Sequence, residues 1–369
     1  MSGSQLNAYV VSGARTDHEC DTAEEALEKL SLGMYVLLRE GSASHDLANL
    51  SGAVNERNFR RFALCTDDRH ADDLAEEGHM DHVLRIAVKS GIRGEIAAVM
   101  CTLNAAECYG LKGKGAIAPG CDADFAVFSD LKDFNCRAVF VGGKKVAEDG
   151  RPLFSARGGL PRAVKNTVHV RPVSADDFTI KLTGSRARVI GIQRDTLVTR
   201  SLIEEVESRG GDVLLEGTDL LRLAVVERHF ASGNIGLGLV KGYGLKGGAA
   251  ATTVAHDSHN MIIIGDDRQA MAQAAEELVR IGGGMALVHG GRVMSVPLDI
   301  AGLMSSARAE VHIARLKKLQ AAARAAGVKD GVEPFMTLSF LALAVIPELR
   351  LTDRGLFDVA SFGFTDINA

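Results

Sequence analysis

The chain has 369 residues, with 42 Lys and Arg against 47 Asp and Glu, which gives a net charge of −5. At roughly 100–200 residues per domain, this length suits two or three domains. Hydrophobic residues make up 46% and charged residues 24% of the chain, which excludes a disordered or collagen-like protein. The slight excess of acidic residues argues against a nucleic-acid or membrane-surface partner, since either would require clustered Lys and Arg.

Nothing in the sequence indicates export or membrane insertion. The N-terminus lacks the basic and apolar regions of a signal peptide. The longest apolar stretch, 335–347, is shorter than the roughly 20 residues of a membrane span. The six cysteines contain no Cys-x-x-Cys pair, so we expect reduced thiols and a cytoplasmic protein.

The N-terminal part of the chain alternates between strand-like and helix-like segments. The strand-like segments are 14–18, 34–40 and 62–65, and the last two are apolar runs typical of buried parallel strands. The helix-like segments are one that begins at a capping box over 21–24, a polar one at 46–56 and an amphipathic one at 80–88. Three strand–helix units in succession predict a parallel α/β sheet or barrel.

The character of the chain changes after residue 110. Strand-like pieces at 122–128 and 138–141 predict a small β region over 111–150, and Gly142-Gly143 predicts a hairpin turn that leads into 144–146. Three of the seven prolines and the pair Gly158-Gly159 lie between residues 150 and 172, which predicts a linker at 151–172. All six cysteines precede this linker, and the shift in composition supports a domain boundary there.

The remaining residues, 173–369, predict a separate unit with a mixed sheet. Its expected elements are strands at 178–182, 187–192 and 261–264, a helix at 267–281, and a hairpin over 286–296. The glycine-rich stretch 236–248 matches neither of the common phosphate-loop patterns, GxxxxGK[ST] and GxGxxG. We interpret its glycines as turns and close backbone packing.

Each of the three expected parallel strands ends in ionisable residues. These residues are Asp17, His18 and Glu19 after the first strand, Arg39 and Glu40 after the second, and Asp67, Asp68, Arg69 and His70 after the third. Ligand and catalytic groups collect at the carboxyl ends of parallel strands, although one such end alone is commonly a solvated loop. Three in succession, with imidazole and carboxylate groups, favour a divalent metal ion that activates water.

A second polar group of residues is the run from His256 to Asn260, which contains Asp257 and His259. Two histidines three residues apart can chelate a metal on a helix. The run follows an Ala- and Thr-rich segment and precedes an apolar one, which favours a loop or a strand end instead. Turn capping and a polar loop that reaches an active site from the second domain both remain open.

Several motifs resemble the bacterial adenine deaminases of the amidohydrolase superfamily, and the resemblance covers essentially the whole chain. These motifs are 16–19 (Thr-Asp-His-Glu), 33–42 (Gly-Met-Tyr-Val-Leu-Leu-Arg-Glu-Gly-Ser), 64–70 (Leu-Cys-Thr-Asp-Asp-Arg-His), 119–124, 233–265 and 351–356. The resemblance implies a metal-dependent (β/α)8 barrel with a small β domain, followed by an α/β C-terminal domain. It also implies the conversion of adenine to hypoxanthine and ammonia by metal-activated water.

The resemblance assigns roles to individual residues. His18 matches a metal ligand after barrel strand six, and Asp67 matches the strand-eight aspartate that binds metal and moves the proton of the attacking water. Arg39, Glu40, Ser42 and Asp68 would contact the substrate. The expected cofactor is a divalent metal ion, Mn²⁺ or Fe²⁺, in a binuclear site. We expect a purine substrate, a homo-oligomer, and neither a nucleic-acid nor a membrane partner.

The sequence departs from the family pattern in its metal ligands. None of the eleven histidines forms the His-x-His pair that the family carries after strand one. The chain matches the family from strand six onward, so we expect a partial barrel at 1–110, the small β region at 111–150, the linker at 151–172 and the C-terminal domain at 173–369. The alternatives to an active deaminase are a catalytically inactive remnant that serves in association, and a different metal hydrolase that uses His256, Asp257 and His259 with Asp67 as a new site.

Overall fold

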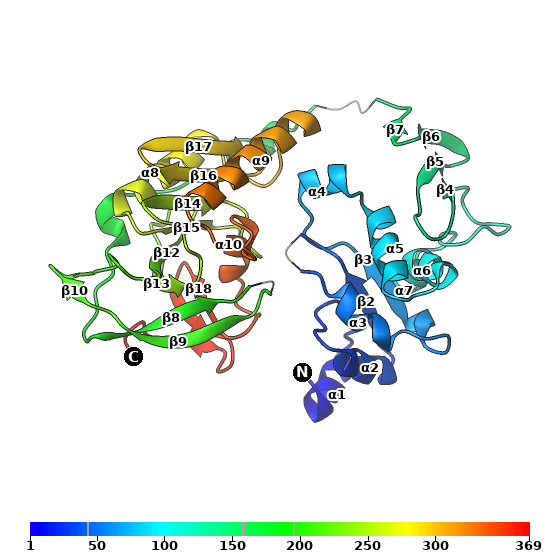
Figure 1. Ribbon diagram of the computed structural model, residues 1–369, viewed down its shortest axis with the longest axis horizontal. Helices are drawn as coiled ribbons and strands as arrows, with labels where there is room; N and C mark the ends of the chain where they lie inside the picture. The colour runs from blue at the N-terminus through cyan, green and yellow to red at the C-terminus, as the bar shows by residue number, and fades with distance from the viewer. Residues whose placement is uncertain (43, 156–158, 195) are drawn as a thin grey trace. The chain divides into compact units, whose positions relative to one another are not determined.

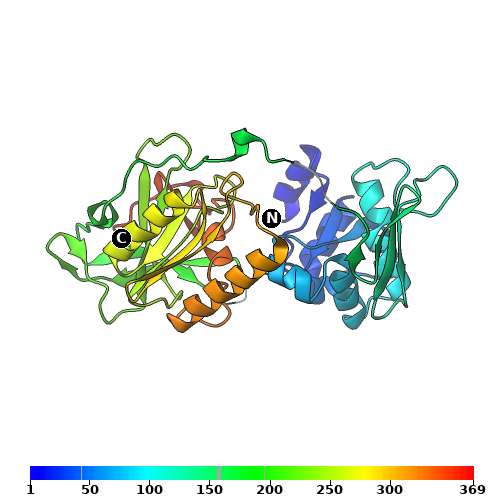
Figure 2. The same ribbon diagram turned by 90° about the horizontal axis from the view of Figure 1, so that it is seen from above.

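The computed structural model describes residues 1–42, 44–155, 159–194 and 196–369. Its chain divides into two units, Met1–Gly158 and Gly159–Ala369, which are described separately below. Figure 1 and Figure 2 show the elements of each unit from two directions. Of the glycine pair in the expected linker, Gly158 lies outside the described residues.

The first unit contains a parallel sheet of three strands in the order β1-β2-β3, as the alternating sequence pattern predicts. The strands are β1 (Thr16–Asp17), β2 (Tyr35–Arg39) and β3 (Phe62–Cys65). The helices are α1 (Gly3–Val11), α2 (Ala23–Ser31), α3 (Leu47–Leu50), α4 (Ala71–Glu76), α5 (Met80–Lys89), α6 (Gly94–Cys101) and α7 (Leu103–Cys108). The described residues of this unit form an open sheet, without a closed barrel.

Apolar side chains on the strands hold the helices against this sheet. Val36 and Leu38 of β2 are fully buried, and they share one hydrophobic core with Val83 and Ala87 of α5. A Val or Leu side chain contributes about 1.5–3 kcal/mol when it is fully buried. This packing explains why the periodicity over 80–88 predicts α5 correctly.

The structure corrects two details of the helices. Helix α2 begins one residue later than the capping box over 21–24 predicts. Its N-cap is Thr22 and not Asp21, because the Thr22 side chain accepts the hydrogen bond from the Glu25 N–H, at 3.2 Å. The polar segment 46–56 is helical only over α3 and a 3₁₀ turn, Ser51–Ala53. The Asn58 side chain then donates to the Ala53 carbonyl, at 2.8 Å, and this bond holds the chain in the turn that follows.

A small antiparallel sheet of four strands follows in the first unit. Its strands are β4 (Phe125–Phe128), β5 (Cys136–Val141), β6 (Lys144–Glu148) and β7 (Arg151–Pro152), in that order. The expected hairpin between β5 and β6 is confirmed, and its turn residues Gly142 and Gly143 have φ of 55° and 75°. Such positive values explain the two glycines, because other residues rarely adopt them.

The second unit is built on a mixed sheet of eight strands in the order β17-β16-β14-β15-β12-β13-β8-β9, in which only β13 and β8 pair in parallel. These strands are β8 (Arg186–Ile192), β9 (Thr199–Glu205), β12 (Leu220–Val226), β13 (Ile235–Lys241), β14 (Gly248–Thr252), β15 (Met261–Gly265), β16 (Gly284–His289) and β17 (Arg292–Pro297). Five shorter strands complete the unit: β10 (Ser208–Arg209), β11 (Asp212–Val213), β18 (Leu349–Thr352), β19 (Gly355–Asp358) and β20 (Gly363–Phe364). The unit is therefore a mixed α/β domain, as expected.

Helices cover both faces of the eight-stranded sheet (Figure 2). They are α8 (Arg268–Arg280), α9 (Ala309–Ala325) and α10 (Met336–Leu341). Along β15, Met261 and Ile263 share a core with α8, whereas Ile262 and Ile264 share the opposite core with α9 and α10. Because side chains alternate between faces along a strand, a continuous apolar run is what a strand covered on both sides requires.

The expected strand at 178–182 is wrong. Residues Ala175–Phe178 form a 3₁₀ turn, because the Ser174 N–H donates to the Asp177 carboxylate, at 2.8 Å, and the two residues form a capping box. The expected strands at 187–192 and 261–264, the helix at 267–281 and the hairpin over 286–296 are confirmed. In the glycine-rich stretch, a Cβ on Gly236 would lie 1.8 Å from the Thr352 carbonyl oxygen, which supports close backbone packing.

Candidate functional site

The carboxyl ends of β1, β2 and β3 bring the ionisable residues of the first unit together. His18 and Glu19 follow β1, Arg39 is the last residue of β2, and Asp67 lies two residues beyond β3. All three strands run in the same direction, so their ends meet at one edge of the sheet. The sequence-based expectation that these strand ends form one cluster is therefore met by the geometry.

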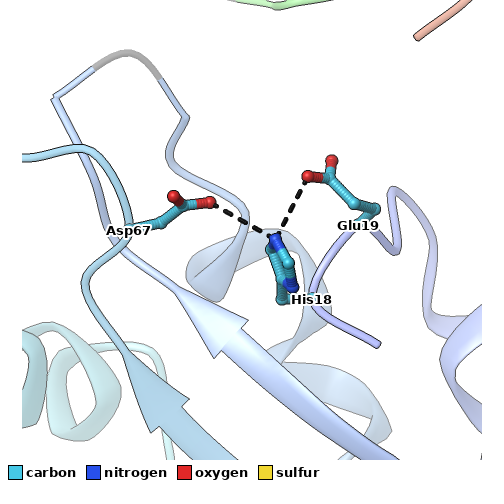
Figure 3. A group of neighbouring side chains, drawn as sticks. All are labelled: His18, Glu19 and Asp67. Carbon is cyan, nitrogen blue, oxygen red and sulfur yellow. Dashed lines mark ion pairs between the residues drawn. The ribbon is translucent and has the colours of Figure 1, made fainter. Parts of the chain in front are cut away.

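His18 lies between two carboxylates in this cluster (Figure 3). Its Nε2 atom is 3.3 Å from Glu19 Oε1 and 3.8 Å from Asp67 Oδ2. One ligand atom from each residue lies within 4.8 Å of the others. Within the described ranges, this is the one group of three His, Cys, Asp or Glu side chains close enough to share a metal ion.

The charges around His18 change its affinity for a proton. The hydrogen bond to Glu19 raises the pKa of His18 above its usual value, although partial burial acts in the opposite direction. The side chains of His18 and Glu19 are each 51% exposed, so water screens much of this interaction. A metal ion at this position would compete with that proton, because a histidine binds metal only when it is neutral.

Arg39 forms ion pairs with two carboxylates of the cluster, those of Glu19 and Asp67. Its side chain is only 5% exposed, and its Nη1 atom lies 2.8 Å from Glu19 Oε1 and 3.0 Å from Asp67 Oδ2. Its Nε atom donates to Asp46 Oδ2, at 2.6 Å. Burial lowers the pKa of the guanidinium, but the bonds to Asp46 and Glu19 outweigh it and raise that pKa. Arg39 is thus a permanent cation that holds three carboxylates.

The backbone at Asp67 orients its two carboxylate oxygens differently. Asp67 has a φ of 60°, a left-handed conformation that Asp adopts more readily than most residues. Its Oδ1 atom accepts a hydrogen bond from the Asp68 N–H, at 2.9 Å. Oδ2 therefore faces His18 and Arg39.

The other residues expected to bind substrate have partners in neighbouring loops and in α4. Glu40 is buried, and its Oε1 atom lies 2.7 Å from His45 Nδ1. The Ser42 hydroxyl donates to the Asp73 carboxylate and accepts from the His70 N–H, at 2.8 Å. The Ser42 N–H donates to the Asp68 carbonyl, at 3.0 Å, which ties the loop after β2 to the loop after β3. Contact of Glu40, Ser42 and Asp68 with a substrate stays a prediction.

The run from His256 to Asn260 forms the loop between β14 and β15 in the second unit. The Ala255 N–H donates to His259 Nδ1, at 3.2 Å, so this nitrogen is an acceptor and the proton of neutral His259 lies on Nε2. Burial lowers the pKa of His259 and favours that neutral form. Among the described residues, His256, Asp257 and His259 do not belong to a three-residue metal group.

The sequence placed Glu19 among the ionisable strand ends but gave it no individual role, and sequence reasoning missed Asp46 altogether. The signal for Glu19 was present, since it directly follows His18 and ends the first strand with a carboxylate. Asp46 gave no such signal, because it lies seven residues after Arg39 and contacts it only when the chain turns back after β2.

A cavity of about 850 Å³ lies in the second unit. Residues of β11, of β12 and of the N-terminus of α8 contribute to its lining, and they include Asp212, Arg222 and Arg268. None of the site residues expected from the sequence lies in its wall.

Across the described part of the chain, no helix combines the length and the apolar character needed to cross a membrane.

Two family models match separate parts of the chain. Residues 4–146 match the amidohydrolase family, and residues 196–363 match the adenine deaminase C-terminal domain. The first match contains the His18 and Asp67 cluster, and the second contains the loop with His256 and His259.

Curated relatives align along the whole chain. The adenine deaminase of Nitratidesulfovibrio vulgaris strain DP4 is 48% identical over 369 residues, which are 100% of this chain and 64% of that protein. Adenine deaminase 2 of Carboxydothermus hydrogenoformans is 45% identical over 100% of this chain and 65% of its own length. The adenine deaminase of Clostridium acetobutylicum is 42% identical over 99% of this chain and 65% of its own length. The chain thus spans a little under two thirds of the length of these relatives.

Solved structures give weaker similarity. A β-aspartyl dipeptidase of Fervidobacterium islandicum AW-1 is 18% identical, with a TM-score of 0.30 over 36% of this chain and 39% of the other. An amidohydrolase of Thermotoga maritima is 17% identical, with a TM-score of 0.22 over 37% of this chain and 43% of the other. These scores are too low to establish a shared fold.

Proposed function

We propose that the chain is a member of the adenine deaminase family of amidohydrolases and that it takes part in the metal-dependent hydrolysis of adenine to hypoxanthine and ammonia. The observation that carries the proposal is the approach of His18 Nε2 to Asp67 Oδ2, at 3.8 Å, where parallel strands end. A histidine and an aspartate at this edge are the groups from which such a hydrolase builds its centre.

The proposed architecture extends the sheet of the first unit. β1, β2 and β3 would be the sixth, seventh and eighth strands of a (β/α)8 barrel, and the four-stranded sheet would belong to the small β domain. The parallel pairing of β1, β2 and β3 and the family match over residues 4–146 support this assignment.

The residues of the cluster fit a divalent cation in part. His18 and Asp67 offer one nitrogen and one oxygen, and Glu19 offers a further oxygen within 4.8 Å. A catalytic site commonly uses three protein ligands, and Glu19 is also held by Arg39 at 2.8 Å. We therefore assign His18 and Asp67 as ligands. A divalent ion held there, such as Mn²⁺ or Fe²⁺, would supply the Lewis acidity that makes water a nucleophile at neutral pH.

Asp67 would carry the proton in this reaction. Its Oδ2 atom would take a proton as water adds to the amino-bearing carbon of adenine, and would return it to the nitrogen that leaves as ammonia. Oδ1 is held by the Asp68 N–H at 2.9 Å, so Oδ2 keeps one orientation through both transfers. The Nη1 atom of Arg39, 3.0 Å from Oδ2, would help to hold this oxygen in place. Arg39, Glu40, Ser42 and Asp68 are the proposed contacts to the purine, and the active assembly is proposed as a homo-oligomer.

A second candidate function is a non-catalytic domain that acts in association. The observation that favours it is the position of Arg39, because a guanidinium within 3.0 Å of both Glu19 and Asp67 neutralises these carboxylates without a metal ion.

Turnover and metal content distinguish the two functions. The purified full chain is loaded with Mn²⁺, and hypoxanthine formed from adenine is measured together with the bound metal per chain. Deamination that requires Mn²⁺ supports the first function; bound metal well below one per chain without turnover supports the second.

The Asp67→Asn variant tests the role of Asp67, and Asp149→Asn is its matched control. Both aspartates have positive φ, 60° and 43°, a conformation that Asn also adopts readily. Asp67→Asn is expected to lose at least about 100-fold in turnover, the usual contribution of a general base. Parental turnover in Asp67→Asn would overturn the assignment, and Asp149→Asn should retain activity.

A further inference from the structure

A buried lysine lies behind the turn that carries His18. Lys29 belongs to α2, and its side chain is only 5% exposed. Its Nζ atom lies 2.9 Å from Asp17 Oδ2, 2.7 Å from Glu25 Oε1 and 3.5 Å from Cys20 Sγ. A buried ammonium group is stable only when its hydrogen-bond donors are used, and these three contacts use them.

Asp17 connects this lysine to the candidate site. One oxygen of its carboxylate, Oδ2, binds Lys29, and the other, Oδ1, accepts the Glu19 N–H at 2.6 Å. The peptide that joins His18 to Glu19 is therefore held by a side chain that is itself held from the helix. The chain of contacts runs from Lys29 to Asp17 and from Asp17 to the Glu19 backbone.

We propose that Lys29 is a positioning residue, which acts through Asp17 to hold the turn that presents His18 and Glu19 to Asp67. The part of this proposal that concerns metal binding rests on the proposed function, because only that function makes His18 a metal ligand. The part that concerns the turn does not, since it follows from the contacts of Lys29 and Asp17 alone.

The alternative is that Lys29 only stabilises α2 through its pair with Glu25, four residues earlier on the same helix. Such pairs contribute about 0.2–0.5 kcal/mol on exposed helix surfaces. That role would not require the contacts to Asp17 and Cys20, which lie outside the helix. The two roles make different predictions for the Glu19 amide. If Lys29 positions the turn, its loss frees this amide to exchange; if Lys29 only stabilises α2, the exchange of this amide does not change.

The test replaces Lys29 in the full chain and follows the Glu19 amide by hydrogen exchange with NMR detection, without metal. Lys29→Met removes the charge and keeps the length of the side chain. The Glu19 amide is expected to exchange at least about 10-fold faster, while amides of β2 keep their protection. Lys29→Arg should restore slow exchange. Lys89→Met is the matched control, because Lys89 is an exposed lysine at the end of α5.

Metal affinity gives the second readout. A residue that orients a metal ligand typically changes metal affinity by about 10–100-fold when it is replaced. We expect the Kd for Mn²⁺ to rise by that factor in Lys29→Met and to stay within about 3-fold of the parent in Lys29→Arg and Lys89→Met.

Unchanged exchange of the Glu19 amide in folded Lys29→Met would overturn the proposal. If Lys29→Met does not fold, Asp17→Asn is tested in its place, because it breaks the same ion pair and conserves the size of the side chain. Asp17→Asn should weaken Mn²⁺ binding to a similar extent. Parental Mn²⁺ affinity in this variant would again overturn the proposal. Mn²⁺ binding that survives His18→Ala would reject the metal site of the proposed function, while the Glu19 exchange would still test Lys29.

Discussion

The Nη1 atom of Arg39 lies 3.0 Å from Asp67 Oδ2, and the Arg39 side chain is almost fully buried between three carboxylates. This single cation joins β2 to the loop after β3. Its removal would leave Glu19, Asp46 and Asp67 close together and without the buried guanidinium that pairs with all three.

Arg39→Met is therefore expected to destabilise the first unit by about 3 kcal/mol, the usual loss when one partner of a buried ion pair is removed. Arg39→Lys should lose less, because it keeps the charge but not the fork that reaches two carboxylates. Urea unfolding measures both. Arg137→Met is the control: Arg137 is 63% exposed in its pair with Asp149, so its replacement should change stability by less than about 1 kcal/mol.

Glu227 provides a pH test in the second unit. Burial raises the pKa of its carboxyl, but hydrogen bonds from the Ser232, His229 and Phe230 N–H groups outweigh it and lower that pKa to about 2. A carboxyl whose pKa falls on folding adds stability above its unfolded value, here 4.5, and loses that contribution as the pH falls toward about 2.

Glu227→Gln should thus cost about 1–3 kcal/mol at pH 7, and the difference from the parent should shrink as the pH falls below about 4.5. Urea unfolding at several pH values measures it. A difference that is constant from pH 7 to pH 3 would show that the charge of Glu227 plays no part.

Gly236 tests the close packing of the glycine-rich stretch. A Cβ at this position would lie 1.8 Å from the Thr352 carbonyl oxygen, so Gly236→Ala must push two strands apart. We expect a loss of at least about 2 kcal/mol, because inserted atoms in a packed region typically cost 1–3 kcal/mol. Gly184→Ala is the matched control: it meets no atom within 4 Å, and its φ is not positive, so it should be neutral or slightly stabilising.

The His259 contact predicts which replacement the loop tolerates. Nδ1 accepts the Ala255 N–H, at 3.2 Å, and His259 has a φ of 49°, which favours Asn among the other residues. The side-chain oxygen of Asn reaches the place of Nδ1, whereas that of Gln reaches the place of Nε2. His259→Asn should therefore unfold at a higher temperature than His259→Gln, and a reversed order would contradict the assigned acceptor.

His256→Ala is expected to leave Mn²⁺ content unchanged, because its loop lacks a three-residue metal group among the described residues.

Local patterns were sufficient for most of the elements. The apolar run of β2, the period of α5 and the glycine pair between β5 and β6 each depend on neighbours in the chain, so the sequence alone predicts them. The expected cluster at the strand ends also follows from local pattern, because parallel strands must end at one edge. His18 and Asp67 were found in this way, by residue type and position after a strand.

Tertiary packing decided the partners within that cluster. Asp46 reaches Arg39, and Lys29 reaches Asp17, only because segments separated along the chain fold back over the sheet. Likewise, Phe178 is buried against α8 from a 3₁₀ turn and not from a strand, because Asp177 captures the Ser174 N–H. By itself, the sequence determined the order of strands and helices and the residues at the strand ends. Only the tertiary structure decided which charges face each other, because buried charges must find partners in space and not along the chain.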